Sequence, residues 1–274
     1  MGAFGAALAA RDLGLERSAL LDARALEAFT HTAKPVTCNL CTNHCSLTVN
    51  QFDGGRRFIS GNRCSRPLGK EKVENPDLMT YKYQKLRALE GKGEGDGSRG
   101  RIGIPFGLNM YENLPFWFAF FTRLNFEVVL SPESSRKLYL KGQHTIPSDT
   151  VCYPAKLLHG HVEALVEAGV DAIWYPCMSY NNDEGIGDNH FNCPVVAYYP
   201  ELLAANMPVL KQTRFLDPYV GLWRRKDFKK RAVKMMEADF GIPKRETEGA
   251  VDAAYAAYDA YVQDVRQTGK AYID

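Results

Sequence analysis

Residues 149–194, DTVCYPAKLLHGHVEALVEAGVDAIWYPCMSYNNDEGIGDNHFNCP, decide how the second half of this chain folds. The amphipathic run 155–168 predicts a helix, and the apolar segment 170–175 that follows it predicts a buried strand. Cys152 precedes this helix and Cys177 follows this strand. In an open α/β sheet both places lie on the edge where ligands bind, so the two thiols predict chemistry there. The alternative is that these cysteines are small thiols buried in a core.

Composition narrows the kind of protein. Of the 274 residues, 45% are hydrophobic and 24% are charged, which is typical of a soluble globular protein. The formal net charge of +2 gives no reason to expect nucleic acid or an anionic membrane as the main partner. The longest apolar run, 114–121, is too short to span a bilayer, and the N-terminus does not have the pattern of a secretory signal. Seven cysteines, four of them in one cluster, favour metal binding in a reducing cytoplasm over disulfides.

The strongest metal-binding pattern is a C-x2-C-x3-C-x18-C spacing formed by Cys38, Cys41, Cys45 and Cys64. Segments 46–49 and 57–60 flank Asp53-Gly54-Gly55, which predicts a hairpin that brings Cys64 back to the other three cysteines. Four thiolates at one point repel one another unless a cation holds them. A 4Fe–4S cluster and tetrahedral zinc both meet this requirement, and a site without metal is the third alternative.

A glycine-rich segment, 90–100, predicts a flexible linker between two domains. Beyond it, helical patterns alternate with short segments predicted as strands, namely 101–105, 126–130, 170–175, 195–198 and 214–217. This alternation predicts a mostly parallel sheet. Two long helices, 225–240 and 248–266, follow. We therefore expect an α/β fold in which a small four-cysteine hairpin module precedes a parallel-sheet domain with C-terminal helices.

Cys193 is expected to stand apart from the other two thiols of the second domain. If 170–175 and 195–198 are parallel strands, Cys177 leaves the first at its carboxyl edge and Cys193 begins the second at the opposite edge. A strand of about five residues spans roughly 16 Å, which is too far for a shared cluster. Cys193 is then a small buried residue, unless the loop 178–192 makes the second strand antiparallel.

Several motifs occur in the order found in one known family: CNLCTNHC at 38–45, SGNRC at 60–64, SDTVCYPAK at 148–156, YPC at 175–177 and NCPVVAYYP at 192–200. On these motifs the chain resembles the large acyl-CoA dehydratase activase-related proteins, also called CoA-substrate-specific enzyme activases. The second domain is more distantly similar to 2-hydroxyacyl-CoA dehydratase subunits and double-cubane-cluster reductases. Residues 2–10 also look like the last helix of the ATPase activase module that precedes this region in the family.

The resemblance implies a Rossmann-like second domain and ATP-driven, low-potential electron transfer to an iron–sulfur cluster that reduces or dehydrates a difficult substrate. Cysteines on sheet-edge loops hold the cluster in the similar proteins, which implies that Cys152 and Cys177 are ligands here. The implied partners are an ATP-dependent activase module or chain and an acyl-CoA substrate. The activase's ATP-binding motifs and the second half of the dehydratase-like region are absent. The chain thus looks like an internal piece with a helical remnant (1–34), a cluster module (35–89), a linker (90–100) and an incomplete dehydratase-like domain (101–274).

We therefore predict an iron–sulfur electron-transfer or dehydratase-like component, with no catalytic residue assigned. The predicted metal ligands are Cys38, Cys41, Cys45, Cys64, Cys152 and Cys177. The alternative is a non-catalytic scaffold or docking module held together by zinc at the first four cysteines. A third alternative is thiol chemistry, in which Cys152 is activated at a helix N-terminus and His159 or His161 acts as the base.

Overall fold

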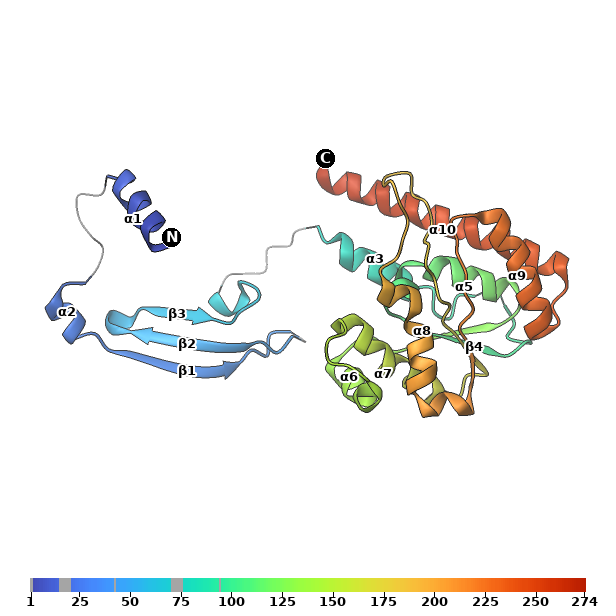
Figure 1. Ribbon diagram of the computed structural model, residues 1–274, viewed down its shortest axis with the longest axis horizontal. Helices are drawn as coiled ribbons and strands as arrows, with labels where there is room; N and C mark the ends of the chain where they lie inside the picture. Colours follow the sequence, from blue (N-terminus) through green and yellow to red (C-terminus); the bar gives the residue numbers. More distant parts are fainter. Residues whose placement is uncertain (1, 15–20, 42, 70–75, 94) are drawn as a thin grey trace. The chain divides into compact units, whose positions relative to one another are not determined.

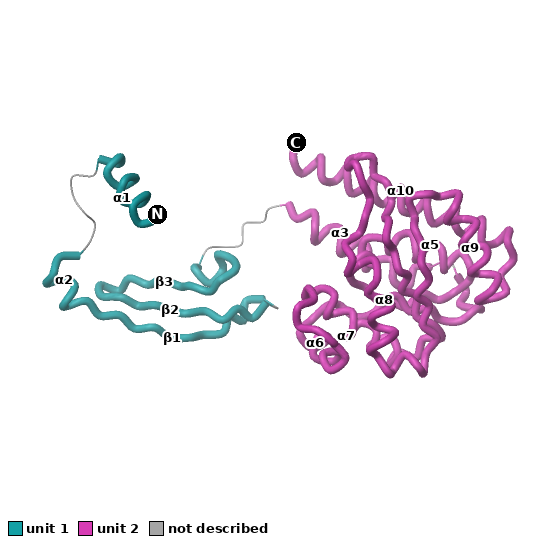
Figure 2. Tube along the Cα trace, viewed as in Figure 1, with its two compact units in different colours: residues 1–74 teal, residues 75–274 magenta. Residues whose placement is uncertain are grey.

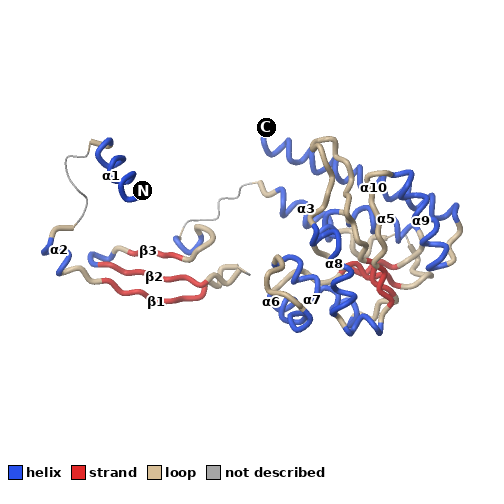
Figure 3. The backbone as a smooth tube through the Cα atoms, viewed as in Figure 1, coloured by secondary structure: helices blue, strands red, loops and turns tan. Residues whose placement is uncertain are grey.

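In the residues that the computed structural model describes (2–14, 21–41, 43–69, 76–93 and 95–274), the strands form two sheets, one antiparallel and one parallel (Figure 3). The antiparallel sheet belongs to a first compact unit, Met1–Glu74, and the parallel sheet to a second, Asn75–Asp274 (Figure 2). The sequence predicted the boundary between the two domains further along the chain, at the glycine-rich segment 90–100.

The first unit contains the hairpin that the sequence predicted. Strand β2 (Ser46–Phe52) pairs antiparallel with β3 (Arg57–Ser60), and the turn between them, Asp53–Gly55, has Gly54 at φ 72°. A strand that the sequence did not predict, β1 (His31–Thr37), pairs with the other side of β2. Two helices precede the sheet in the chain: α1 (Gly2–Asp12) and α2 (Ala23–Glu27).

The second unit contains the predicted parallel sheet, with the strand order β5-β4-β6-β7. The strands are β4 (Arg101–Ile104), β5 (Glu127–Leu130), β6 (Ala172–Trp174) and β7 (Arg214–Leu216). Ile102 of the central strand β4 pairs with Val128 on one side and with Ala172 on the other. The chain therefore moves outward from β4 to β5, then crosses back to β6 on the opposite side of β4. This reversal creates the crevice at which open α/β sheets bind ligands.

Helices cover both faces of the parallel sheet (Figure 1). On one face α10 (Lys244–Ile273) packs against α5 (Leu114–Arg123) and α9 (Arg225–Phe240). On the other face α7 (Tyr153–Glu167) packs against α6 (Arg136–Gly142) and α8 (Pro194–Asn206). The remaining helices of this unit are α3 (Leu78–Arg87) and α4 (Leu108–Glu112).

Aromatic side chains fill the core beneath α5, as expected for this phenylalanine-rich segment. Phe116, Trp117 and Trp174 are fully buried. The rings of Trp117 and Trp174 lie 5.1 Å apart, and Phe116 meets Tyr255 edge-to-face at 4.8 Å. These contacts join α5 to the sheet on one side and to α10 on the other.

The prediction of a strand at 195–198 is wrong, because these residues lie in helix α8. Two consecutive valines suggested a strand, but Cys193 and Pro194 carry the signal for a helix. Cys193 is the N-cap, and its sulfur accepts the backbone N–H of Val196 at 3.5 Å. Pro194 occupies the first helical turn, where the missing N–H has no cost.

The glycine-rich segment before β4 packs against the second unit. A Cβ added at Gly95 would lie 2.7 Å from the backbone oxygen of Thr122, so the absence of a side chain permits this approach. Arg99 donates to the backbone oxygen of Leu124 at 3.1 Å and to Glu246 at 2.7 Å. These contacts explain why the division between the two units falls before α3.

Candidate functional site

Three cysteines lie at the carboxyl edge of the parallel sheet, and we call them the sheet-edge thiols: Cys152, Cys177 and Cys193. Cys152 is the N-cap of α7 and Cys193 is the N-cap of α8. Helices that connect parallel strands begin at the carboxyl edge, which places both caps there. Cys177 follows β6 at the same edge, where its backbone N–H donates to Pro218 at 3.0 Å.

The loop 178–192 returns on itself and brings Cys193 back to Cys177. Tyr180 and Phe191 form an antiparallel bridge within this loop. The Asn192 side chain donates to the backbone oxygen of Met178 at 2.8 Å. Since Met178 follows Cys177 and Asn192 precedes Cys193, this bond ties the two cysteine-bearing segments together. The prediction that Cys193 lies at the opposite edge is therefore wrong, because α8 is a helix.

Tyr175 lies between β6 and Cys177 and is fully buried. Its hydroxyl has no hydrogen-bond partner among the residues that the structure describes. Burial is the main cause that raises the pKa of Tyr175, followed by Tyr199 and then by the sheet-edge thiols. All three thiols are therefore within electrostatic reach of this one phenol. An unpaired buried hydroxyl costs about 1–3 kcal/mol, so its place among the thiols calls for a functional reason.

Tyr199, on α8, forms the next layer of the site. Its hydroxyl lies 3.0 Å from Nε2 of His159, and Nδ1 of His159 lies 2.6 Å from the hydroxyl of Thr145. Burial, and then the charge of Cys152, raises the pKa of Tyr199 to about 12. The Thr145–His159–Tyr199 chain thus holds α8 against α7 next to Cys152.

Cys177 differs from the other two sheet-edge thiols because it is fully buried, whereas they are exposed. Burial is the main cause that raises the pKa of Cys177 to about 11. The backbone N–H of Glu201 opposes this shift, and the carboxylates of Glu201 and Asp217 add to it. In this environment the Cys177 sulfur is a neutral thiol at neutral pH unless a cation binds it.

The other four cysteines, which we call the quartet (Cys38, Cys41, Cys45 and Cys64), belong to the first unit. The loop that joins β1 to β2 carries three of them, and the N–H of Cys38 closes this loop on the oxygen of Cys45 at 2.9 Å. Cys64 follows β3, which ends at the same end of the sheet because Ser60 pairs with Thr48. Arg66 donates to the backbone oxygen of Leu40 at 3.3 Å and so connects the segment after β3 to this loop.

A glycine permits this arrangement at the end of the sheet. Gly61 has φ +81°, and a Cβ there would lie 2.3 Å from the backbone oxygen of Ser46. The strand order therefore directs all four quartet cysteines to one end of the antiparallel sheet.

Neither set of cysteines forms a closed metal site. Among the described residues, no group of three or more His, Cys, Asp or Glu side chains is close enough to hold a metal ion. All seven cysteines are free thiols. The predicted metal-binding hairpin is thus present as a hairpin, with four possible ligands at one end, and its metal is not shown. The donor chemistry of both sets still fits a thiophilic metal, because several thiols without disulfide partners share one end of a sheet.

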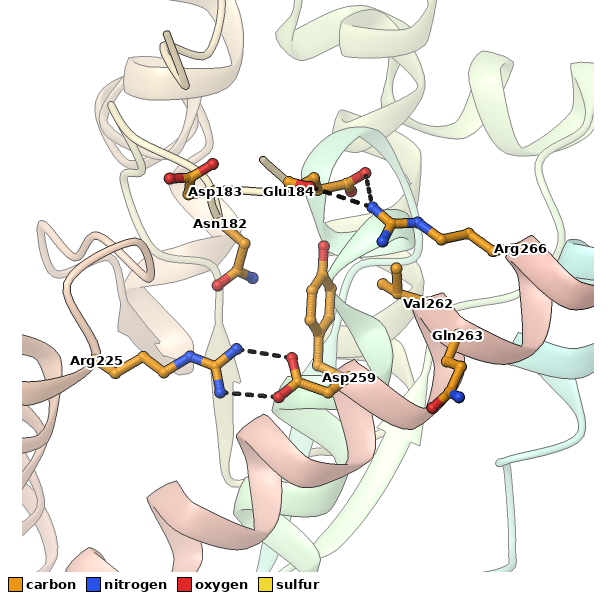
Figure 4. Close-up of a pocket in the computed structure, with 9 residues that line it drawn as sticks. Asn182, Asp183, Glu184, Arg225, Asp259, Val262, Gln263 and Arg266 are labelled. Carbon is orange, nitrogen blue, oxygen red and sulfur yellow. Dashed lines mark hydrogen bonds and ion pairs between the residues drawn. The ribbon is translucent and has the colours of Figure 1, made fainter. Parts of the chain in front are cut away.

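A polar pocket of about 340 Å³ lies between the loop 178–192, α9 and α10 (Figure 4). Arg225 pairs with both carboxylate oxygens of Asp259, at 2.7 and 2.8 Å. Arg266 contacts Glu184 at 3.4 Å. Both arginines of the pocket therefore pair with carboxylates that line it, and the Arg266–Glu184 contact attaches the loop to α10.

Further buried polar groups lie in the segment that follows β4. Asn109, which follows β4, donates from its side chain to the sulfur of Met178 at 3.3 Å. Its side-chain oxygen has no partner among the described residues, nor have the side-chain atoms of the fully buried Asn113. The Asn109–Met178 contact thus joins α4, which follows β4, to the segment that follows β6.

The sequence of residues 101–274 matches the family described as the CoA enzyme activase uncharacterised domain. This range is more than half of the chain and contains the whole parallel sheet and the sheet-edge thiols. The chain belongs to the CoA enzyme activase family. The predicted resemblance to acyl-CoA dehydratase activase-related proteins is thereby confirmed at the level of the family. The comparisons with curated proteins and with solved structures found no match.

In this activase-related protein both ring nitrogens of each candidate histidine base already have a hydrogen-bond partner. His161 lies 2.6 Å from the hydroxyl of Ser131 and 2.9 Å from that of Ser134, one contact for each ring nitrogen. His159 contacts Thr145 and Tyr199 in the same way. Neither ring has a free nitrogen to accept the proton of Cys152, so this structure does not support the thiol-catalysis alternative.

Sequence reasoning missed Tyr175 and Tyr199 as residues of this site. Both lie inside the quoted motifs YPC and NCPVVAYYP, next to the cysteines that carried the prediction. Their places in the same motifs as Cys177 and Cys193 could have drawn attention to them. Among the described helices of the activase-related protein, none is long and apolar enough to cross a membrane.

Proposed function

We propose that this chain is an iron–sulfur component of an ATP-driven, low-potential system of the acyl-CoA dehydratase type. The observation that carries the proposal is that Cys152, Cys177 and Cys193 all lie at the carboxyl edge of the parallel sheet, within electrostatic reach of the buried Tyr175. It is supported by membership in the CoA enzyme activase family, since this region of the sheet lies within the matched residues.

The proposed ligands of the sheet-edge cluster are all three sheet-edge thiols, one more than the sequence predicted. Each comes from a different segment: the start of α7, the end of β6 and the start of α8. The positive ends of two helix dipoles favour a bound anionic group there. A cluster held by Cys152, Cys177 and Cys193 would supply one-electron chemistry at this edge of the sheet.

The quartet is proposed to hold a second cluster, of the 4Fe–4S type, which relays electrons. Four thiols, the number that such a cluster requires, follow strands that end together. Zinc is the competing metal, because tetrahedral four-thiolate sites are also common for structural zinc. The chain would work with an ATP-dependent activase module or chain and with an acyl-CoA substrate.

The test is metal analysis of the full chain, purified without oxygen and reconstituted with ferrous iron and sulfide. Iron, zinc and acid-labile sulfide are measured, together with the visible absorbance before and after dithionite. We expect broad absorbance that bleaches on reduction. Cys152→Ser, Cys177→Ser and Cys193→Ser should each remove the iron of the sheet-edge cluster and leave that of the quartet. Cys41→Ser should remove the iron of the quartet and leave that of the sheet-edge cluster.

Ser179→Ala is the matched control, because Ser179 lies in the same loop as Cys177 and carries no thiol. It should retain the full iron content. Colourless protein with one zinc per chain would contradict the electron-transfer function and favour the zinc-held scaffold. Iron that depends on Cys41 alone would contradict the sheet-edge cluster and leave the quartet as the cluster site.

A further inference from the structure

We propose that the Tyr175 hydroxyl donates a hydrogen bond to a sulfur atom of the group held by the sheet-edge thiols, and thereby raises its reduction potential. This inference rests on the proposed function and adds to it a positioning residue that is not a ligand. Sulfur atoms bound to iron accept hydrogen bonds, and such bonds are among the factors that set cluster potentials.

The first support is the state of the hydroxyl itself. Tyr175 is fully buried, and its oxygen has no partner among the described residues. Buried hydroxyls normally have a partner, since desolvation without one is unfavourable. The backbone fixes this residue. Its N–H donates to the oxygen of Leu216 at 2.9 Å, and two residues later Cys177 forms a parallel bridge with Tyr219. The side chain therefore cannot leave the site by a simple shift of the strand.

The second support is that the neighbouring phenol, Tyr199, already donates its hydrogen bond to a protein group. The Thr145 hydroxyl lies 2.9 Å from the oxygen of Gly142, to which it can only donate. Its contact with Nδ1 of His159 is then one in which the imidazole donates. Because the buried His159 has its pKa lowered to about 4, the ring is neutral and Nε2 must accept. The Tyr199 hydroxyl therefore donates to His159, and of these two phenols Tyr175 is the one whose O–H has no partner among the described residues.

The third support is the surroundings of the phenol. Tyr175 is within electrostatic reach of all three sheet-edge thiols and of Tyr199. Cys177, two residues further along the chain, is buried, whereas Cys152 and Cys193 are exposed. A donor that comes from the protein interior reaches the side of a bound group that water cannot reach. Water cannot replace this hydrogen bond when the hydroxyl is removed.

The experiment compares Tyr175→Phe with Tyr255→Phe in the full chain. Tyr255 is a matched control, because it is a buried tyrosine of the same unit whose hydroxyl does have a partner, the oxygen of Leu222 at 2.8 Å. Each protein is measured without metal, by thermal unfolding, and after iron–sulfur reconstitution, by iron content and by the midpoint potential of the absorbance that depends on Cys152.

We expect Tyr175→Phe to leave the unfolding temperature of the metal-free protein unchanged or higher, and Tyr255→Phe to lower it. In the reconstituted protein, Tyr175→Phe should bind as much iron as the wild type and have a more negative midpoint potential. Tyr255→Phe should not change this potential.

Equal iron and an equal potential in Tyr175→Phe and wild type would overturn this inference and leave the proposed function intact. A loss of unfolding temperature in metal-free Tyr175→Phe as large as in Tyr255→Phe would also overturn it, because the hydroxyl would then have a protein partner. A wild-type protein whose iron does not depend on the sheet-edge thiols would overturn the proposed function as well.

Discussion

At the residue scale, two buried histidines show how this domain satisfies buried polar groups. His159 and His161 are both fully buried on α7 and bonded at both ring nitrogens. Burial is the main cause that lowers the pKa of each to about 4; the charge of His144 adds to this at His159 and that of Arg87 at His161. Both imidazoles are therefore neutral at neutral pH and connect α7 to its neighbours.

These histidines predict how stability depends on pH. The pKa is near 6.5 when the chain is unfolded and lower when it is folded, so the unfolded state binds more protons between these values. Stability should be complete above pH 6.5 and fall as the pH drops toward 4, by up to about 1.4 kcal/mol per pH unit for each histidine. Urea unfolding at pH 7, 6 and 5 measures this slope.

The His159→Gln variant is the comparison, because glutamine remains polar but does not titrate in this range. Its stability should fall less steeply below pH 6.5 than that of the wild type. An identical slope would show that other groups cause the acid sensitivity.

At the scale of the elements, α6 and α7 touch through two glycines. A Cβ on Gly142 would lie 2.3 Å from the backbone nitrogen of Gly160, and a Cβ on Gly160 would lie 1.9 Å from the backbone oxygen of Leu138. The obstacles are backbone atoms, so no side-chain rotation can relieve them. This close packing sets the position of α7, whose N-terminus carries Cys152.

Gly160→Ala should therefore destabilise the second unit by about 1–3 kcal/mol or more, because α6 must move away from α7. Gly249→Ala is the control, since Gly249 is also helical but a Cβ there meets nothing within 4 Å. It should stabilise the protein by about 0.5–1 kcal/mol through helix propensity. Urea unfolding of both variants checks this difference, and equal effects would contradict the close contact.

Helix α8 shows why one element could not be identified from its own residues. Its apolar run is short, and short apolar runs fit a buried strand or a buried helix equally well. The cap at Cys193 and the proline after it favour a helix, and Pro200 lies inside this helix without ending it. Because these residues form a helix and not a strand, Cys193 lies at the same sheet edge as Cys177, and it joins the proposed ligand set.

At the scale of the whole molecule, the second unit includes α3, which precedes the range matched by the family. Leu86 of α3 is fully buried in the core of this unit. The Tyr81 hydroxyl donates to Asp264 of α10 at 2.6 Å, and Arg87 donates to the oxygen of Ser131 at 3.0 Å. Helix α3 is therefore a part of the α/β domain rather than of the cysteine module.

This division predicts different stabilities for two fragments. A fragment of residues 76–274 should unfold cooperatively, whereas 101–274 should be less stable by at least about 2–5 kcal/mol, the cost of removing one buried leucine side chain. Urea unfolding of both fragments, followed by circular dichroism, measures the difference. Equal stabilities would show that α3 is only loosely attached and would favour a boundary at 90–100.

The sequence by itself determined the family, the alternation that gives a parallel α/β sheet, the β2–β3 hairpin and the residues with metal-binding chemistry. These features depend on local order: the spacing of apolar residues, the turn Asp53–Gly55 and cysteines at fixed separations. Strand β1 carries Pro35 and is exposed along its whole length, so its residues lack the alternation that marks a half-buried strand.

Only the tertiary structure decided which distant residues meet. The turn of the loop 178–192 back onto itself brings Cys193 to Cys177, and the burial of Tyr175 leaves its hydroxyl without a partner among the described residues. Packing also decided that the glycine-rich segment before β4 lies against the α/β domain and is not a free linker. Glycines permit flexibility, but they equally permit close contact with another backbone. Hydrogen-bond partners and burial belong to pairs of segments, and a pattern within one segment does not contain them.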